Sequence, residues 1–186
     1  MISLGLDIST NCTGYALINE NEELESYGYI DTSISNDLYE KIEIFENSIA
    51  KHIAKRPDVI MIEDILSKFT KGRSSIKIII ALAKFNALAS YKCYELSGNQ
   101  PIHLNVLRSR NLALGHSVPR GVNSKEHILK YIIEKYPHIE LPRMKKKDAL
   151  AKQAYDICDA VIMSLAGFKH VEHSETTEKS TGRAGT

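Results

Sequence analysis

The chain has 186 residues, of which 43% are hydrophobic and 25% charged, so it carries enough apolar mass for one hydrophobic core. No apolar run is long enough to span a bilayer, and the N-terminus has no signal-like basic and apolar segment. The three cysteines are odd in number and widely spaced, which suggests neither a disulfide framework nor a zinc pair. We therefore expect a protein of a reducing compartment, the cytoplasm, with no membrane partner and no organic cofactor.

The formal net charge of +1 hides a strong asymmetry along the chain. Residues 1–64 hold thirteen acids and four Lys or Arg, for a net charge of −9. Residues 65–125 hold one acid, Glu95, and ten Lys or Arg, for a net charge of +9. A segment with so few acids focuses positive potential on one part of the surface, which favours a polyanion-binding face over scattered solvated lysines.

The first half of the chain predicts three strands, a helix and a fourth strand. Residues 2–8, 13–19 and 24–31 have the apolar content of strands, with a polar turn at 19–23 that predicts a hairpin. A helical stripe with spacings of four and three follows, formed by Leu38, Ile42, Phe45, Ile49 and Ile53. The apolar run at 58–64 predicts a buried parallel strand that ends in acids.

The second half predicts a long helix that Ser74 or Ser75 caps and that ends near Leu96, then a fifth strand at 101–107. Residues 108–122 are predicted to be irregular and basic, and Asn123 to open a helix to about Tyr136. A basic loop at 142–148 precedes a final amphipathic helix over 148–167. This order predicts one α/β domain over residues 1–170, a mixed five-stranded sheet flanked by helices, and a disordered polar tail at 171–186.

Four carboxylates lie in apolar surroundings on three of these elements. Asp7 is on the first strand, Glu63 ends the fourth, and Asp156 and Asp159 share one face of the last helix at spacing i, i+3. A buried unpaired carboxylate costs several kcal/mol unless it is protonated, paired or bound to a metal. If the first and fourth strands are neighbours, all four acids can meet at the strand ends, where open α/β sheets place their sites.

Such a carboxylate set suits hard cations such as Mg²⁺ or Mn²⁺. Two ions about 4 Å apart can activate a water and stabilise the leaving oxygen of a phosphodiester. We therefore expect two Mg²⁺ ions, replaceable by Mn²⁺, with Asp7 between them and Glu63, Asp156 and Asp159 completing the ligand sets.

The chain resembles the RuvC-like Holliday junction resolvases, which have a ribonuclease-H-like fold. The resemblance is carried by "GLDISTNCTGYAL", "VIMIED" and "DICDAVIMSLAG", which match the family's opening Asp strand, its Glu after an apolar strand and the paired acids of its last helix. It covers residues 1–168. It implies a homodimeric, metal-dependent endonuclease that resolves four-way DNA junctions by paired symmetric nicks, and the helix at 75–96 as the dimer interface.

The resemblance also implies further site residues. Lys125 is expected to contact a phosphate or stabilise the transition state. The residues expected to contact DNA are Lys68, Phe69, Lys71, Arg73, Lys77, Arg108, Arg110 and Lys125. The family usually has an aromatic wedge three residues after its glutamate. This chain has Leu66 there, so Phe69 is the candidate wedge or a dimer contact. Such departures fit a divergent member from a phage or mobile element, acting in a bacterial cell or phage-infected host.

Three alternatives stay open at the level of sequence. Another ribonuclease-H-like nuclease could use the same acids on branched DNA or an RNA–DNA hybrid. An actin- or sugar-kinase-type nucleotide binder also opens with an acidic strand, although that family has glycine in place of Ser9 and needs two such domains. An inactive junction-binding protein would ordinarily have lost one of the four acids.

Overall fold

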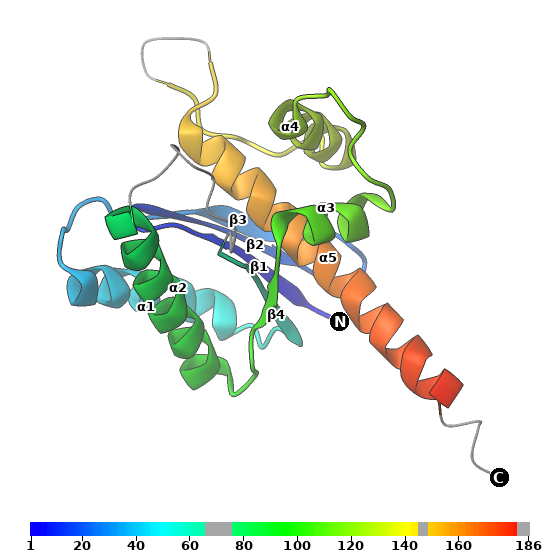
Figure 1. Ribbon diagram of the computed structural model, residues 1–186, viewed down its shortest axis with the longest axis horizontal. Coiled ribbons are helices and arrows are strands. Elements are labelled where there is room, and N and C mark those ends of the chain that lie inside the picture. Colours follow the sequence, from blue (N-terminus) through cyan, green and yellow to red (C-terminus); the bar gives the residue numbers. More distant parts are fainter. Residues whose placement is uncertain (66–75, 145–148, 182–186) are drawn as a thin grey trace.

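The computed structural model describes residues 1–65, 76–144 and 149–181, with side chains described as far as residue 171. Its centre is a mixed sheet in the order β3-β2-β1-β4-β5 (Figure 1). Antiparallel pairing joins β1 to β2 and β2 to β3, whereas β4 is parallel to both β1 and β5. The strands are β1 (Ser3–Ile8), β2 (Cys12–Ile18), β3 (Leu24–Asp31), β4 (Val59–Glu63) and β5 (Ile102–Leu104). The predicted five-stranded α/β sheet, with the first and fourth strands adjacent, is confirmed.

The side chains of β1 alternate between the two faces of the sheet. Leu4, Leu6 and Ile8 join a core with α1 (Leu38–Ile53) and α2 (Ile76–Ser97). Ser3, Gly5 and Asp7 face the opposite side, which is covered by α5 (Lys152–Thr181), and Figure 1 shows this helix crossing the sheet. The face that carries Asp7 is therefore the face that packs against α5.

Two glycines let α5 approach the sheet closely. A Cβ on Gly5 would overlap the Ala160 carbonyl oxygen and the Ser164 nitrogen, and a Cβ on Gly14 would overlap the Asp156 carbonyl. A reciprocal pair of buried hydrogen bonds sets the position of the helix: Ser3 Oγ donates to the Ser164 carbonyl and Ser164 Oγ donates to the Ser3 carbonyl, both at 2.8 Å. These contacts determine which part of α5 lies over Asp7.

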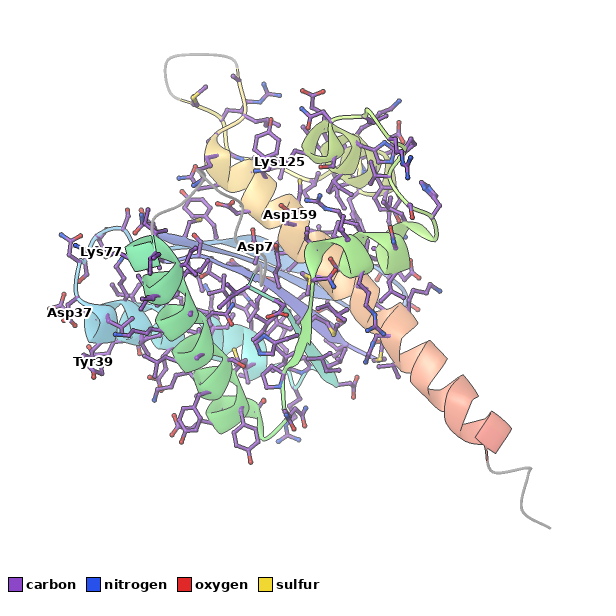
Figure 2. The ribbon with its side chains drawn as sticks, in the orientation of Figure 1. Asp7, Asp37, Tyr39, Lys77, Lys125 and Asp159 are labelled. Carbon is purple, nitrogen blue, oxygen red and sulfur yellow. The ribbon has the colours of Figure 1, made fainter. Side chains whose placement is uncertain are left out.

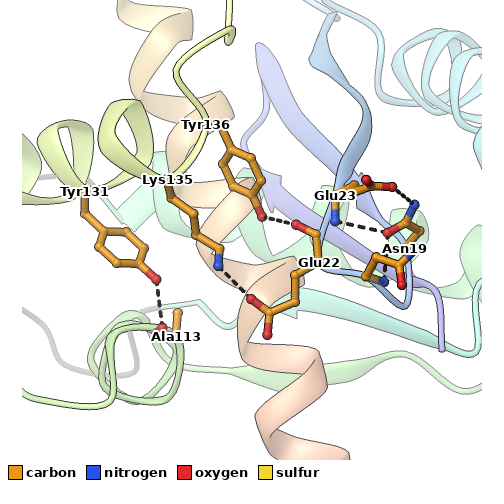
Figure 3. Close-up of polar contacts among 8 residues, drawn as sticks. Asn19, Glu22, Glu23, Ala113, Tyr131, Lys135 and Tyr136 are labelled. Carbon is orange, nitrogen blue, oxygen red and sulfur yellow. Dashed lines mark hydrogen bonds and ion pairs between the residues drawn. The ribbon is translucent and has the colours of Figure 1, made fainter.

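Two shorter helices, α3 (Val106–Leu114) and α4 (Ser124–Lys135), lie beside α5. Figure 3 shows how α4 is anchored: Lys135 Nζ lies 2.6 Å from Glu22 Oε2, and the Tyr136 hydroxyl donates to the Glu22 carbonyl at 3.0 Å. The Tyr131 hydroxyl donates to the Ala113 carbonyl of α3 at 3.3 Å. These bonds tie α4 to the β2–β3 turn and to α3.

The sequence prediction for residues 101–122 is wrong in two respects. The fifth strand ends at Leu104, and α3 occupies part of the stretch predicted to be irregular. The Asn105 side chain caps α3 by accepting from the Arg108 backbone N–H at 2.9 Å, and Gly115 ends it with a φ of 75°. Asn105 and Gly115 are both typical of helix ends. The apolar pair Val106 and Leu107 continues the strand pattern, however, so the sequence does not predict that a helix begins there.

The last helix also differs from its predicted bounds, since it begins at Lys152 and continues past residue 167 to Thr181. It thus extends into the segment predicted as a disordered tail, because neither proline nor glycine interrupts residues 168–181. The other predicted elements agree within a few residues, and Asn123 caps α4 by accepting from the Lys125 N–H at 3.1 Å. The predicted caps Ser74 and Ser75 lie outside the described residues. Across the described ranges, no helix is both long enough and apolar enough to cross a membrane.

We expect Gly5→Ala to lower the free energy of unfolding by about 3 kcal/mol, because backbone atoms of α5 occupy the space of the new methyl group. Gly98→Ala is the control, since a Cβ there meets nothing within 4 Å and only the φ of +74° opposes it, at a cost of about 1 kcal/mol. Urea unfolding followed by circular dichroism measures both. If both variants lowered the free energy of unfolding equally, the close packing of α5 on the sheet would be contradicted.

Candidate active site

The site begins at the carboxyl ends of two neighbouring parallel strands. Leu6 of β1 pairs with Ile62 of β4, so the next residues lie side by side: Asp7, the last but one residue of β1, and Glu63, the last residue of β4. Their carboxyl groups share a hydrogen bond. The backbone of Glu63 is held as well, because the Nδ2 of buried Asn86 in α2 donates to its carbonyl at 3.3 Å.

The other two acids come from the first turns of α5. Gly14 pairs with Asp7 across β1 and β2, and it lies against the backbone of Asp156. Asp159 lies one turn further along the helix, and Figure 2 shows it near Asp7 at the centre of the view. The structure therefore brings the four predicted carboxylates, from three separate elements, to one edge of the sheet.

Burial and crowding raise the pKa values of two of these acids, Asp7 and Glu63. Burial raises the pKa of Asp7 well above its usual value, and the charges of Glu63, Asp159 and Asp156 raise it further. Burial and the charge of Asp159 also raise the pKa of Glu63, whereas the hydrogen bond with Asp7 and the charges of Arg110 and Lys125 oppose that rise. The edge thus carries more negative charge than the surrounding protein compensates.

Arg110 does not lie where the sequence predicts a DNA-backbone contact. It is 8% exposed, and its Nη2 lies 2.8 Å from Asp159 Oδ1. The reason is the helical turn of α3: two residues rotate the side-chain direction by about 200°, so Arg110 faces α5 while Arg108 is exposed. An irregular loop, as predicted for this stretch, would have left both guanidinium groups at the surface.

Two further side chains complete the surroundings of the acids. Lys125, at the start of α4, is exposed, lies 5.7 Å from the centre of the Tyr155 ring and is close enough to Glu63 to affect its pKa. Cys12, at the start of β2, hydrogen-bonds Asp156, and burial together with this bond raises the pKa of the thiol. The sequence analysis did not assign Cys12 to the site, because its place on the strand that follows Asp7 carries no such signal.

The remaining predicted DNA contacts are only partly described. Lys77 is exposed at the start of α2, and Figure 2 shows it apart from the carboxylates. The other predicted contacts lie outside the described residues: Lys68, Phe69, Lys71 and Arg73.

The donor chemistry of the four acids fits Mg²⁺ or Mn²⁺, because carboxylate oxygens are the ligands that hard cations prefer. Within the described ranges, no three His, Cys, Asp or Glu side chains form a ready-made metal cage. Asp159 is paired with Arg110, and Asp7 with Glu63. Because a carboxylate has two oxygens, Asp159 can keep its bond to Arg110 through Oδ1 and still offer its other oxygen to a cation.

Comparison with solved structures identifies the fold. A structure of Thermus thermophilus RuvC in complex with a Holliday junction substrate matches with a TM-score of 0.69 and 13% identity, over 94% of this chain and 96% of that chain. A second Thermus thermophilus RuvC structure matches with a TM-score of 0.65 and 13% identity, over 94% and 97%. No protein-family model and no curated protein sequence matches. The fold is therefore the ribonuclease-H-like fold of RuvC.

In the presence of a chelator, we expect Asp7→Asn to raise the Tm at neutral pH, by about 2–4 °C for each kcal/mol of repulsion relieved. The pKa of Asp7 is higher in the folded protein than in the unfolded chain, so ionisation destabilises the fold as the pH rises through the folded-state value. The gain should vanish at pH values below 3.8, where both states are protonated. Thermal unfolding across pH measures the effect.

Asp159→Asn is the matched variant, and we expect it to act in the opposite direction. It removes the carboxylate that compensates the buried Arg110 guanidinium, at a cost of about 3 kcal/mol. If both variants shifted the Tm in the same direction, the charge balance described for this edge would be wrong.

Proposed function

We propose that this protein is a metal-dependent endonuclease that resolves four-way DNA junctions. The observation that carries the proposal is the incompletely compensated cluster of Asp7, Glu63, Asp156 and Asp159 at one edge of a RuvC fold. A protein of this fold, Thermus thermophilus RuvC, has been seen in complex with a Holliday junction substrate. Its place of action would be the cytoplasm of a bacterial cell or of a phage-infected host.

The four acids would hold two Mg²⁺ ions, or Mn²⁺ in their place. When bound, such ions polarise the scissile phosphate and activate a water for hydrolysis. Asp7 and Glu63 have raised pKa values, so a bound cation favours their ionised forms and is itself favoured as the pH rises. The proposal thus requires both carboxyl groups to be ionised when the cation is bound.

The cations beside the acids have separate roles. The Lys125 ammonium is exposed and near Glu63, where it can receive a phosphate oxygen of the strand to be cut. Arg110 is buried against Asp159, so it holds this carboxylate in place rather than contacting DNA directly. Arg110 is therefore a positioning residue.

Paired symmetric nicks require two active sites related by a two-fold axis, and α2 offers an interface for a homodimer. Its exposed apolar residues include Ile76, Ile80, Ala87, Tyr91 and Tyr94. At 100° per residue these five fall within about 60° around the helix, opposite the buried Phe85 and Ala89. Two other exposed apolar residues of α2, Ile78 and Leu96, lie outside this stripe. This stripe on α2 is the surface that we expect a second copy of the chain to cover.

We expect the purified protein to cut a labelled four-way junction at symmetric positions with Mg²⁺ and not with chelator. Asp7→Asn should lower cleavage by at least about 100-fold, because it removes a metal ligand, while junction binding is kept. Gel analysis of the products and fluorescence polarisation of the complexes measure the two effects. Asn preserves the shape of the side chain, so a loss of binding together with cleavage would mean that Asp7 is structural.

Three further substrates separate the alternatives in the same assay. Equal cutting of forks would indicate a general branch nuclease, and cutting of an RNA–DNA hybrid alone would place the activity on RNA. Linear duplex DNA is the negative control. Binding of the junction without cleavage of any substrate would contradict the proposed catalysis.

We expect Tyr91→Glu to convert the dimer to a monomer of 20.9 kDa by placing a charge within the α2 stripe. Ile34→Glu is the control, since Ile34 is 76% exposed but lies on a loop outside the stripe. Light scattering after size-exclusion chromatography measures the mass. A monomeric wild type, or a monomer produced by both variants, would contradict this interface.

A further inference from the structure

A positively charged feature lies on the face of the sheet that α1 and α2 cover, opposite α5. A cavity of about 500 Å³ opens between the start of α1 and the first turns of α2. Its apolar wall includes Leu38, Ile80 and Phe85, and its polar rim carries three ammonium groups, those of Lys41, Lys77 and Lys84. Among the residues that the structure describes, no acid lines this cavity, which we call the α1–α2 pocket.

Lys41 is the buried member of the three. It is only 8% exposed, and its Nζ donates to the Thr10 carbonyl at 2.6 Å and to Asn11 Oδ1 at 2.8 Å. Both acceptors are neutral, so they satisfy hydrogen bonds without cancelling the charge. Buried lysines are rare unless they are paired, so an uncompensated ammonium on a pocket wall favours an anionic ligand.

The other two lysines are exposed on α2 and add to this charge. Across residues 1–65, 76–144 and 149–171, none of the three pocket lysines has a carboxylate oxygen within 4.0 Å. Hydrogen bonds from Ser33 and, less strongly, the charge of Lys41 lower the pKa of Asp31, but Asp31 is exposed and does not line the pocket. The pocket therefore keeps a net positive charge.

The pocket shares a turn of the chain with the candidate active site. Thr10, on its wall, lies three residues after Asp7, and Lys41 binds the same turn. Lys77 and Lys84 are seven residues apart on one helix, or about 10 Å, which corresponds to roughly three phosphates along one DNA strand. A strand that passes Asp7 can thus continue over this turn onto the lysines.

We infer that the α1–α2 pocket binds the phosphate backbone of the nucleic acid beside the segment held at the carboxylates. The inference rests on the proposed function, because it takes DNA to be the molecule held at Asp7. Binding here is expected to be independent of sequence, since lysines contact phosphates rather than base edges. The pocket would hold a junction arm in position and leave the chemical step to the four acids.

The test measures DNA binding without cleavage. Fluorescence polarisation of a labelled four-way junction, in chelator and at several salt concentrations, compares the wild type with the double variant Lys77→Gln, Lys84→Gln. We expect the Kd to rise roughly tenfold and the salt slope to fall by about 1.8, because two phosphate contacts are lost. Lys51→Gln is the control, since Lys51 is exposed at the far end of α1, and it should change the Kd less than about twofold.

Lys84→Arg keeps the charge and should bind like the wild type, whereas Lys84→Gln alone should lower the salt slope by about 0.9. If the double variant does not fold, the comparison of Lys84→Arg with Lys84→Gln tests whether the pocket binds phosphates. The inference would be overturned if the double variant or Lys84→Gln had the same Kd and salt slope as the Lys51→Gln control. A wild type that binds no DNA would also overturn it.

Junction cleavage with Mg²⁺ is a separate measurement, so the two proposals can fail independently. A wild type that binds but does not cut would contradict the nuclease proposal, while the binding comparison would still decide the role of the pocket.

Discussion

The approach of α5 to the sheet is the constraint on which the site depends. Gly5 and Gly14 leave no Cβ where the helix backbone passes, and Ser3 and Ser164 bond reciprocally in the buried interface. Together they set the position of the helix along β1, and therefore the distance of its acids from Asp7. A side chain at either glycine would lift the helix and separate charges that the strands and the helix hold together.

This close packing produces electrostatic repulsion between the carboxylates. The fold brings four acids together and compensates them incompletely, with Arg110 buried beside Asp159 and Lys125 exposed near Glu63. Proteins retain such unfavourable charge where it serves a site, since the same repulsion that raises the pKa values favours the arrival of a cation. Stability and chemistry are therefore linked through the same side chains.

The helix α2 has a buried face and an exposed face. Phe85 and Ala89 enter the core, whereas Tyr91 of the exposed apolar stripe and Lys84 of the α1–α2 pocket lie on the opposite face. Ile80 belongs to both the stripe and the pocket wall, so the pocket borders the proposed dimer interface. A dimer formed through this stripe would bring two positively charged edges together beside its two-fold axis. Such an arrangement matches the symmetry of a four-way junction, whose arms also meet around a two-fold axis.

Apolar periodicity in the sequence by itself determined that the chain forms five strands and the helices α1, α2 and α5, because the spacing of apolar residues is a local property. The sequence also identified the four acids, two on strands and two on the last helix, as charges in apolar surroundings. Tertiary packing alone decided that Arg110 turns inward to Asp159, since its direction depends on a short helix that a strand-like pattern concealed. It also decided the place of Lys41, which lies 30 residues from the Asn11 that it contacts. Contacts between residues so distant in the chain leave no local pattern to read.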